Sequence, residues 1–276
     1  MRSRFGLGGL YMVMTAAGLA TVMVLSTTGN GSVVHAQTPT KAIGRTPDGK
    51  PDFNGVWQAM TSAAWDLQDH NAQAGWPAGQ TVVENNEIPY RPEMLAKKKS
   101  NYENREKADP VNNCFLPGVP RITYMPFPFR ISQTPMHIAI MYEYSHAYRM
   151  IYMNGTKHPE ALEFWMGDSR GRWEGDTLVV DVADFVEQTW FDKAGNFHSD
   201  ALHVVERYTM IGPDHIRYDV TIEDPKVFTR PWKMSIPLYR RLEPNIRILD
   251  YECLEFMLPH LPWYEVPQGL PKPPGR

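Results

Sequence analysis

The stretch "IRYDVTIE", residues 216–223, decides the fold class of this chain. Apolar or aromatic side chains at positions 216, 218, 220 and 222 alternate with polar ones at 217, 219, 221 and 223. A period of two is typical of a β-strand that has one face in a core and the other in water. This stretch therefore predicts an antiparallel sheet.

Runs of the same kind lie on both sides of it. "DFNGVWQAM" predicts a first strand, and "MHIAIMYEY" with "YRMIYM" predicts a hairpin that turns at Ser145-His146. Further strands are expected at residues 177–185, 202–210, 232–239 and 246–255, and residues 171–177 are expected to form a turn. About eight strands without crossover helices indicate a mainly β fold. We expect an antiparallel meander that closes into a barrel, because closure removes exposed sheet edges.

The first strand carries the tripeptide Gly55-Val56-Trp57. A Gly-x-Trp at the start of a meander resembles the calycin and lipocalin-like barrels, in which the tryptophan plugs the closed end. In those barrels an arginine from a late strand covers the tryptophan. The resemblance implies that Arg240, Arg241 or Arg247 covers Trp57 here.

A second resemblance spans most of residues 50–255. The blocks "PDFNGVW", "CFLPGVPR", "GDSRGRWEGDTLVVD", "FHSDALHVVER" and "YECLE" are similar to those of a large family of uncharacterised exported bacterial proteins. Membership would imply export. It implies no particular activity.

The N-terminus has the order of a secretory signal. Two positive charges precede an apolar run from Phe5 to Leu25, and small residues lead up to Ala36. We expect a signal peptide at residues 1–36 and a periplasmic or secreted protein; the competing interpretation is an uncleaved membrane anchor. A polar lead (37–52), one β-barrel domain (53–257) and a Pro-rich tail (258–276) follow. An insertion at about 61–112 should contain one solvent-exposed helix that begins near Pro92 and ends before Pro110.

The two cysteines, Cys114 and Cys253, are an even pair in a chain with an export signal. Such a pair predicts a disulfide bond rather than a metal site. It would tie the entrance of the β region to its last strand. Two buried thiols are the alternative.

Composition excludes several classes of partner. The net charge is −3 and no basic stripe with interleaved aromatic residues is present, so a nucleic-acid partner is not expected. No Gly-rich loop opens a helix, which disfavours nucleotide binding. No membrane span is expected after signal cleavage, and we expect no organic cofactor.

Glu206 is the most informative polar residue. In "LHVVERYTM" it shares a face with Leu202, Val204 and Tyr208, so the pattern places a carboxylate on the apolar side. A buried carboxylate is either paired, for example with Arg149, or has a raised pKa that suits proton transfer. Both interpretations stay open.

Three loop residues complete the set of catalytic candidates. His158, Asp168 and His198 are expected to meet at one end of the barrel, with Glu206 below them on the inner face. His137, His158, His198 and Asp168 could form a metal site by residue type. No two of them have a tight ligand spacing, so we expect no metal.

These observations favour a barrel that binds a small apolar or aromatic molecule in its interior. A cofactor-independent acid/base enzyme (lyase, isomerase or hydratase) that uses the same cavity is the alternative. A third hypothesis is an envelope interaction protein that uses the Pro-rich tail. The expected cavity walls are Tyr142, Tyr152, Trp173, Trp190, Tyr208, Tyr218 and Trp232.

Overall fold

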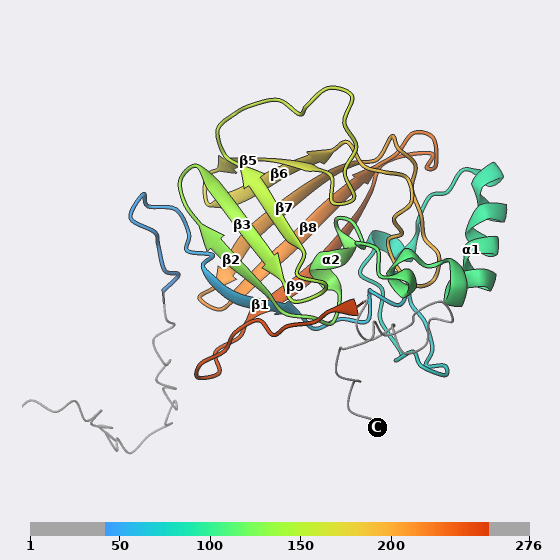
Figure 1. Ribbon diagram of the computed structural model, residues 1–276, viewed down its shortest axis with the longest axis horizontal. Coiled ribbons are helices and arrows are strands. Elements are labelled where there is room, and N and C mark those ends of the chain that lie inside the picture. The colour runs from blue at the N-terminus through green and yellow to red at the C-terminus, as the bar shows by residue number, and fades with distance from the viewer. Residues whose placement is uncertain (1–41, 254–276) are drawn as a thin grey trace, which may run out of the picture. The chain divides into compact units, whose positions relative to one another are not determined.

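Nine β-strands close into a barrel in the computed structural model, which describes residues 42–253 (Figure 1). The strands follow sequence order around the ring, and β1 pairs with β9 to close it. The mainly β barrel expected from the alternating runs is confirmed, with nine strands where about eight were expected. The strands are β1 (Gly55–Ala59), β2 (Phe129–Gln133), β3 (His137–Tyr142), β4 (Tyr148–Tyr152), β5 (Asp168–Glu174), β6 (Thr177–Ala183), β7 (His203–Gly212), β8 (His215–Glu223) and β9 (Trp232–Arg240).

One strand pair departs from the antiparallel meander. β4 and β5 run parallel, with Ile151 opposite Ser169, whereas the other neighbours in the ring are antiparallel. A parallel pair needs a connection that returns along the sheet to the starting end. Residues 153–167 make this return, and we call them the crossover segment.

Two expectations about strands were wrong. Residues 171–174 belong to β5, so the turn is shorter than 171–177 and lies at Gly175-Asp176. Residues 246–253 form no ladder strand and contribute only a bridge from Tyr251 to Tyr144. The physical reason is closure: β1 already occupies the free edge of β9, so no edge is left for another strand. The remaining two residues of that expected strand lie outside the described residues.

The insertion has the expected helix. A 3₁₀ turn at Pro92–Met94 leads into α1 (Leu95–Ala108), and the helix ends before Pro110. α1 buries none of its residues and lies beside the barrel (Figure 1). Two further 3₁₀ turns among the described residues are at Glu84–Asn86 and Pro110–Asn113. A second helix, α2 (Arg121–Tyr124), is fully buried and was not anticipated.

The closed end of the barrel has the tryptophan and arginine that the calycin resemblance implied. Trp57 is completely buried, and its indole N–H donates to the carbonyl oxygen of Phe53 at 2.8 Å. The guanidinium carbon of Arg240 lies 4.3 Å from the centre of the Trp57 ring. Trp173 stacks on Phe53 at the same end, with ring centres 5.8 Å apart. Together these side chains form a floor under the barrel core.

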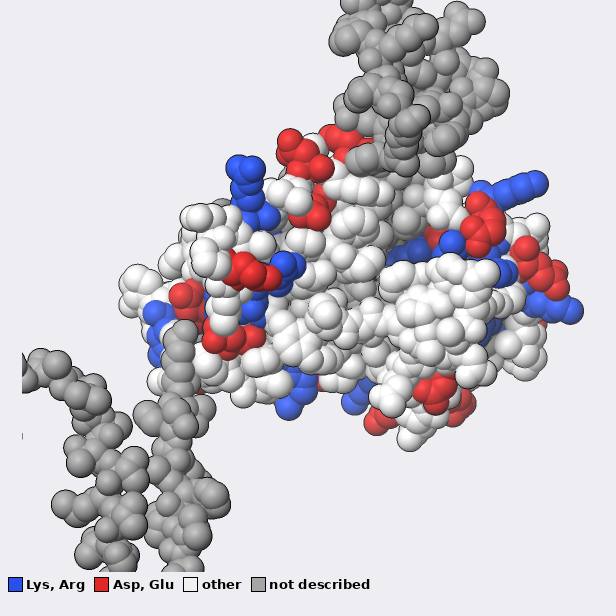
Figure 2. All heavy atoms as spheres, turned by 90° about the horizontal axis from the view of Figure 1, so that it is seen from below, with Lys and Arg blue, Asp and Glu red and all other residues white. Residues whose placement is uncertain are grey.

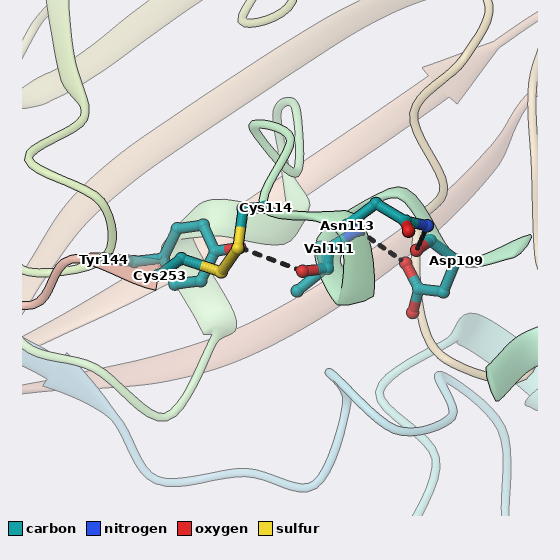
Figure 3. The surroundings of a disulfide bond; sticks show 6 residues. All are labelled: Asp109, Val111, Asn113, Cys114, Tyr144 and Cys253. Carbon is teal, nitrogen blue, oxygen red and sulfur yellow. Dashed lines mark hydrogen bonds between the residues drawn. A yellow bond between two sulfur atoms is a disulfide. The ribbon is translucent and has the colours of Figure 1, made fainter. Parts of the chain in front are cut away.

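The predicted disulfide between Cys114 and Cys253 is confirmed, with Cα atoms 5.4 Å apart. Figure 3 shows Tyr144 beside the bond; its hydroxyl donates to the carbonyl oxygen of Val111 at 3.3 Å. Cys253 lies beyond β9 in the segment that follows the barrel, so the expectation that it belongs to the last strand was wrong.

The expected signal peptide and the Pro-rich tail lie outside the described residues. Within residues 42–253, no helix has the length and apolar character needed to cross a membrane. On the face shown in Figure 2, acidic and basic side chains are interspersed around uncharged surface. That face therefore presents no broad patch of one charge sign, in keeping with the net charge of −3.

Candidate functional site

The centre of the barrel is occupied by an ion pair. Arg149 on β4 donates from Nη1 to Glu206 Oε1 on β7 at 3.0 Å, and its Nη2 donates to the second carboxylate oxygen. The Nε of Arg149 also donates to the hydroxyl of Ser169 at 2.8 Å. Both charged residues are buried. Of the two interpretations of Glu206, the structure therefore shows the ion pair with Arg149.

Two phenols complete the bonding of the same carboxylate. Tyr208 and Tyr218 donate to Glu206 Oε1 at 3.1 and 2.5 Å, and their rings lie 4.8 Å apart. Burial raises the pKa of both phenols, and the neighbouring Glu206 charge raises it further. Both phenols therefore stay protonated and act as donors. Within the core, Glu206 therefore accepts hydrogen bonds from Arg149 and from both phenols.

His198 is held as a neutral imidazole, away from the Arg149–Glu206 pair and with hydrogen-bond partners of its own. Its side chain is buried between the rings of Phe185 and Phe191. Nδ1 lies 2.8 Å from the carbonyl oxygen of Ser199, so Nδ1 carries the proton, and Nε2 accepts from the hydroxyl of Thr189 at 2.6 Å. Burial lowers the pKa of His198 to about 4.

His158 and Asp168 meet on the outside of the barrel. Ser169 points inward to Arg149, so its neighbour Asp168 points outward, because side chains alternate along a strand. Gly167 makes this strand start possible: its φ is +64°, and a Cβ there would lie 2.7 Å from the Phe185 ring. The Nδ1 of His158, on the crossover segment, lies 2.7 Å from Asp168 Oδ2.

A row of charged residues continues from this pair across the outer face. Nε2 of His158 lies 2.8 Å from Asp181 Oδ1 on β6, and the same oxygen lies 3.1 Å from His203 Nε2 on β7. His203 Nδ1 reaches Glu223 on β8 at 3.3 Å. Partial burial favours a higher pKa for Asp181, but the hydrogen bonds and charges of the two histidines outweigh it and hold the pKa below its usual value.

The structure thus brings together two of the four catalytic candidates. His158 and Asp168 share one hydrogen-bonded row, while His198 and Glu206 belong to separate buried networks. Sequence reasoning missed Asp181, His203 and Glu223. They occupy outward positions of neighbouring strands, and His203 pairs directly with Glu223, but only the strand register shows this.

The seven aromatic candidates are distributed over the barrel. Tyr142, Tyr208 and Tyr218 are in the core, Trp190 and Trp232 are buried, and Trp173 lies in the floor beside Phe53. Tyr152 is only partly buried, and the guanidinium of Arg170 lies 4.7 Å from the centre of its ring. None of the seven lines any of the four cavities described for residues 42–253.

The roomiest of those four cavities is a groove of about 720 Å³ between the insertion and strands β1 and β9, which we call the β1–β9 groove. Its walls are mainly apolar, with a few amide and hydroxyl groups. The lining residues are Gln58, Ala59, Met60, Thr61, Ser62, Trp65, Pro77, Ala78, Gly79, Gln80, Thr81, Val82, Pro126, Ser235 and Pro237.

A smaller cavity of about 460 Å³ lies between α1 and the loop that carries Asp66 and His70. Burial raises the pKa of Asp66. Next to it, burial and the charge of Asp66 raise the pKa of the fully buried Asp192 to about 7. Asp192 accepts hydrogen bonds from the Leu67 and Asn196 backbone N–H groups, so it ties the insertion to the loop before β7.

Neither the models of known protein families nor the curated proteins give a match to this chain.

Proposed function

We propose that this barrel protein binds a small apolar or aromatic molecule, and that it does so in the β1–β9 groove. The observation that carries the proposal is the groove itself. Its volume of about 720 Å³ is within the range typical of small-molecule sites, roughly 300–1,000 Å³. The interior that the sequence suggested is occupied by the Arg149–Glu206 pair and its phenols.

The chemistry of the walls supports an apolar ligand with few polar groups. Met60, Trp65 and Pro237 supply flat or flexible apolar surface, and Met60 is 70% exposed, so it is available for contact. Gln58 and Ser235 add polar groups to the lining of the same groove. Apolar walls with a few polar groups that fix orientation are what small-molecule sites require.

The disulfide between Cys114 and Cys253 supports a location outside the cytoplasm, because such bonds persist in oxidising compartments. We propose a periplasmic or secreted protein. Its ligand would then be a compound that is present outside the inner membrane.

The experiment is a titration with the neutral aromatic probe N-phenyl-1-naphthylamine, followed by its fluorescence. Ala78 is exposed and lines the groove, so Ala78→Trp fills the site without changing the core. Ala72→Trp is the matched control, because Ala72 is exposed in the same insertion and does not line the groove. We expect saturable binding to the parent and the control, and at least tenfold weaker binding to Ala78→Trp. Equal binding to all three chains, or none to the parent, would overturn the proposal.

A further inference from the structure

The crossover segment places a histidine over two carboxylates. Ligand atoms of His158, Asp168 and Asp184 all lie within 4.8 Å of one another. His158 comes from the crossover segment, Asp168 begins β5, and Asp184 directly follows β6. Side chains from three separate segments therefore converge at one point on the outer face of the barrel.

Asp184 supplies an independent observation. Its Oδ2 atom is buried and has no hydrogen-bond partner among the described residues. A carboxylate oxygen that is removed from water and left without a donor is unfavourable, and native structures usually compensate it with a donor or a cation. The unpartnered oxygen belongs to the same residue that completes the His158 and Asp168 group.

We propose that His158, Asp168 and Asp184 bind one divalent transition-metal ion of the zinc type. One imidazole nitrogen with two carboxylate oxygens is a donor set suited to Zn²⁺, and three protein ligands leave a fourth position open for water or another ligand. In a tetrahedral zinc site ligand atoms lie roughly 3 to 3.5 Å apart. His158 Nδ1 and Asp168 Oδ2, now 2.7 Å apart, would therefore separate slightly, and the widest pair of the group, within 4.8 Å, would close around the ion.

Asp181, a neighbour of the three ligands, orients His158 for metal binding. Asp181 accepts from Nε2 of His158 at 2.8 Å, which leaves Nδ1 as the ligand atom once its proton passes to solvent. A carboxylate behind a histidine is a common arrangement in metal sites, because it fixes the tautomer and the ring orientation.

The guanidinium of Arg170 lies at the site and holds Asp168 in place. Its Nη2 donates to Asp168 Oδ1 at 2.9 Å and its Nε to Oδ2 at 2.5 Å. Each carboxylate oxygen has a second lone pair, and the one on Oδ2 faces His158 at 2.7 Å. The three carboxylates of Asp168, Asp181 and Asp184 outnumber the guanidinium of Arg170 and the imidazole of His203, which faces Asp181 at 3.1 Å. The site therefore stays attractive to a cation.

His158 and Asp168 were metal candidates by residue type, but their spacing in the sequence did not indicate a metal site. His158 and Asp168 are ten residues apart, and Asp184 was not among the candidates. The site exists only because the parallel pairing of β4 and β5 sends the crossover segment along the outer face. We infer the metal from the folded arrangement, against the expectation from spacing.

The test is zinc binding by the mature, disulfide-bonded chain after treatment with EDTA, measured by isothermal titration calorimetry. We expect one Zn²⁺ per chain, with Mg²⁺ binding far more weakly because magnesium prefers oxygen ligands. Asp184→Asn and His158→Gln should each weaken zinc binding at least tenfold. Asp200→Asn and His137→Gln are matched controls on exposed acid and histidine positions outside the group, and they should bind as the parent does.

A second readout separates loss of a ligand from misfolding. Without metal, Asp184→Asn should melt at the same temperature as the parent or higher, because the buried Oδ2 of Asp184 has no hydrogen bond to lose. Zinc should raise the melting temperature of the parent and of both controls, and should leave Asp184→Asn unchanged. If the parent takes up no stoichiometric zinc, or if Asp184→Asn and His158→Gln bind it as tightly as the parent, the site is not a metal site.

Discussion

Arg149 and Glu206 face each other across the inside of the barrel, from strands that are not neighbours in the ring. The pair joins β4 to β7, 57 residues later in the chain, and the two side chains are 2% and 0% exposed. Neither charge reaches water, so each depends on the other and on Ser169, Tyr208 and Tyr218.

Glu206→Gln is therefore expected to destabilise the protein strongly. The change leaves the Arg149 charge buried without a counter-charge, which costs about 3–5 kcal/mol in comparable cases. The measurement is the free energy of unfolding in urea, followed by tryptophan fluorescence. The double variant Arg149→Met, Glu206→Leu should lose clearly less than the two single variants together, because no charge remains buried. Additive losses would show that the two residues do not act as a pair.

Acidification should weaken the protein through His198. Its folded-state pKa of about 4 lies below the ordinary value of 6.5, so its contribution to stability is present above about pH 6.5 and is lost as the pH falls through 4. A shift of this size corresponds to about 3 kcal/mol for a fully buried group. Urea unfolding at pH 7 and pH 4 should show that His198→Gln loses less stability on acidification than the parent.

Asp192 should change the stability of the protein with pH in the opposite direction to His198. Its folded-state pKa of about 7 lies above the ordinary value of 3.8, so its contribution is present below about pH 4 and is lost as the pH rises through 7. Asp192→Asn should therefore lose more stability on acidification than the parent does, the reverse of His198→Gln. Identical pH profiles for parent and variants would contradict both assignments.

Removal of Trp57 should open the floor of the barrel. Trp57→Ala is expected to cost roughly 3–5 kcal/mol, as for other buried aromatic residues, because the ring is fully buried under Arg240. Trp173→Ala should cost less, since Trp173 is only partly buried. Urea unfolding of both variants gives the comparison. A loss below about 1 kcal/mol for Trp57→Ala would contradict its role in the floor.

The alternation of apolar and polar residues was sufficient to predict most strands of the barrel. The strands that it predicted wrongly have physical explanations. β8 alternates between buried and outward residues as "IRYDVTIE" indicated. β5 was missed because its inward positions are Ser169, Gly171 and Trp173, which do not form an apolar row. Residues 246–253 alternate in sequence but find no free edge, because closure of the ring is a property of the whole fold.

The candidate sites were harder to predict than the fold. The pattern of β7 did indicate an inward Glu206, and Arg149 was named as its partner. The meeting of His158 with Asp168 and Asp181 depends on the crossover segment and on strand register, neither of which is visible in a single sequence. The β1–β9 groove depends on how the insertion lies over β9, which alternation does not specify.

The disulfide has a consequence for the order in which the barrel can be sealed. The bond encloses residues 114–253, and with them β2 to β9, but leaves β1 outside the covalent ring. β1 comes first in the chain, but its pairing with β9 needs residues from the far end of the barrel. Arg241, for example, which contacts Gln58, lies 183 residues after it. Through the sulfur bridge the path between these two residues shrinks to roughly 70 residues, which lowers the entropic cost of closing the seam by about 0.9 kcal/mol. Oxidation before closure would thus bring the ends of the sheet within easier reach of each other, so the disulfide would assist the assembly of the barrel.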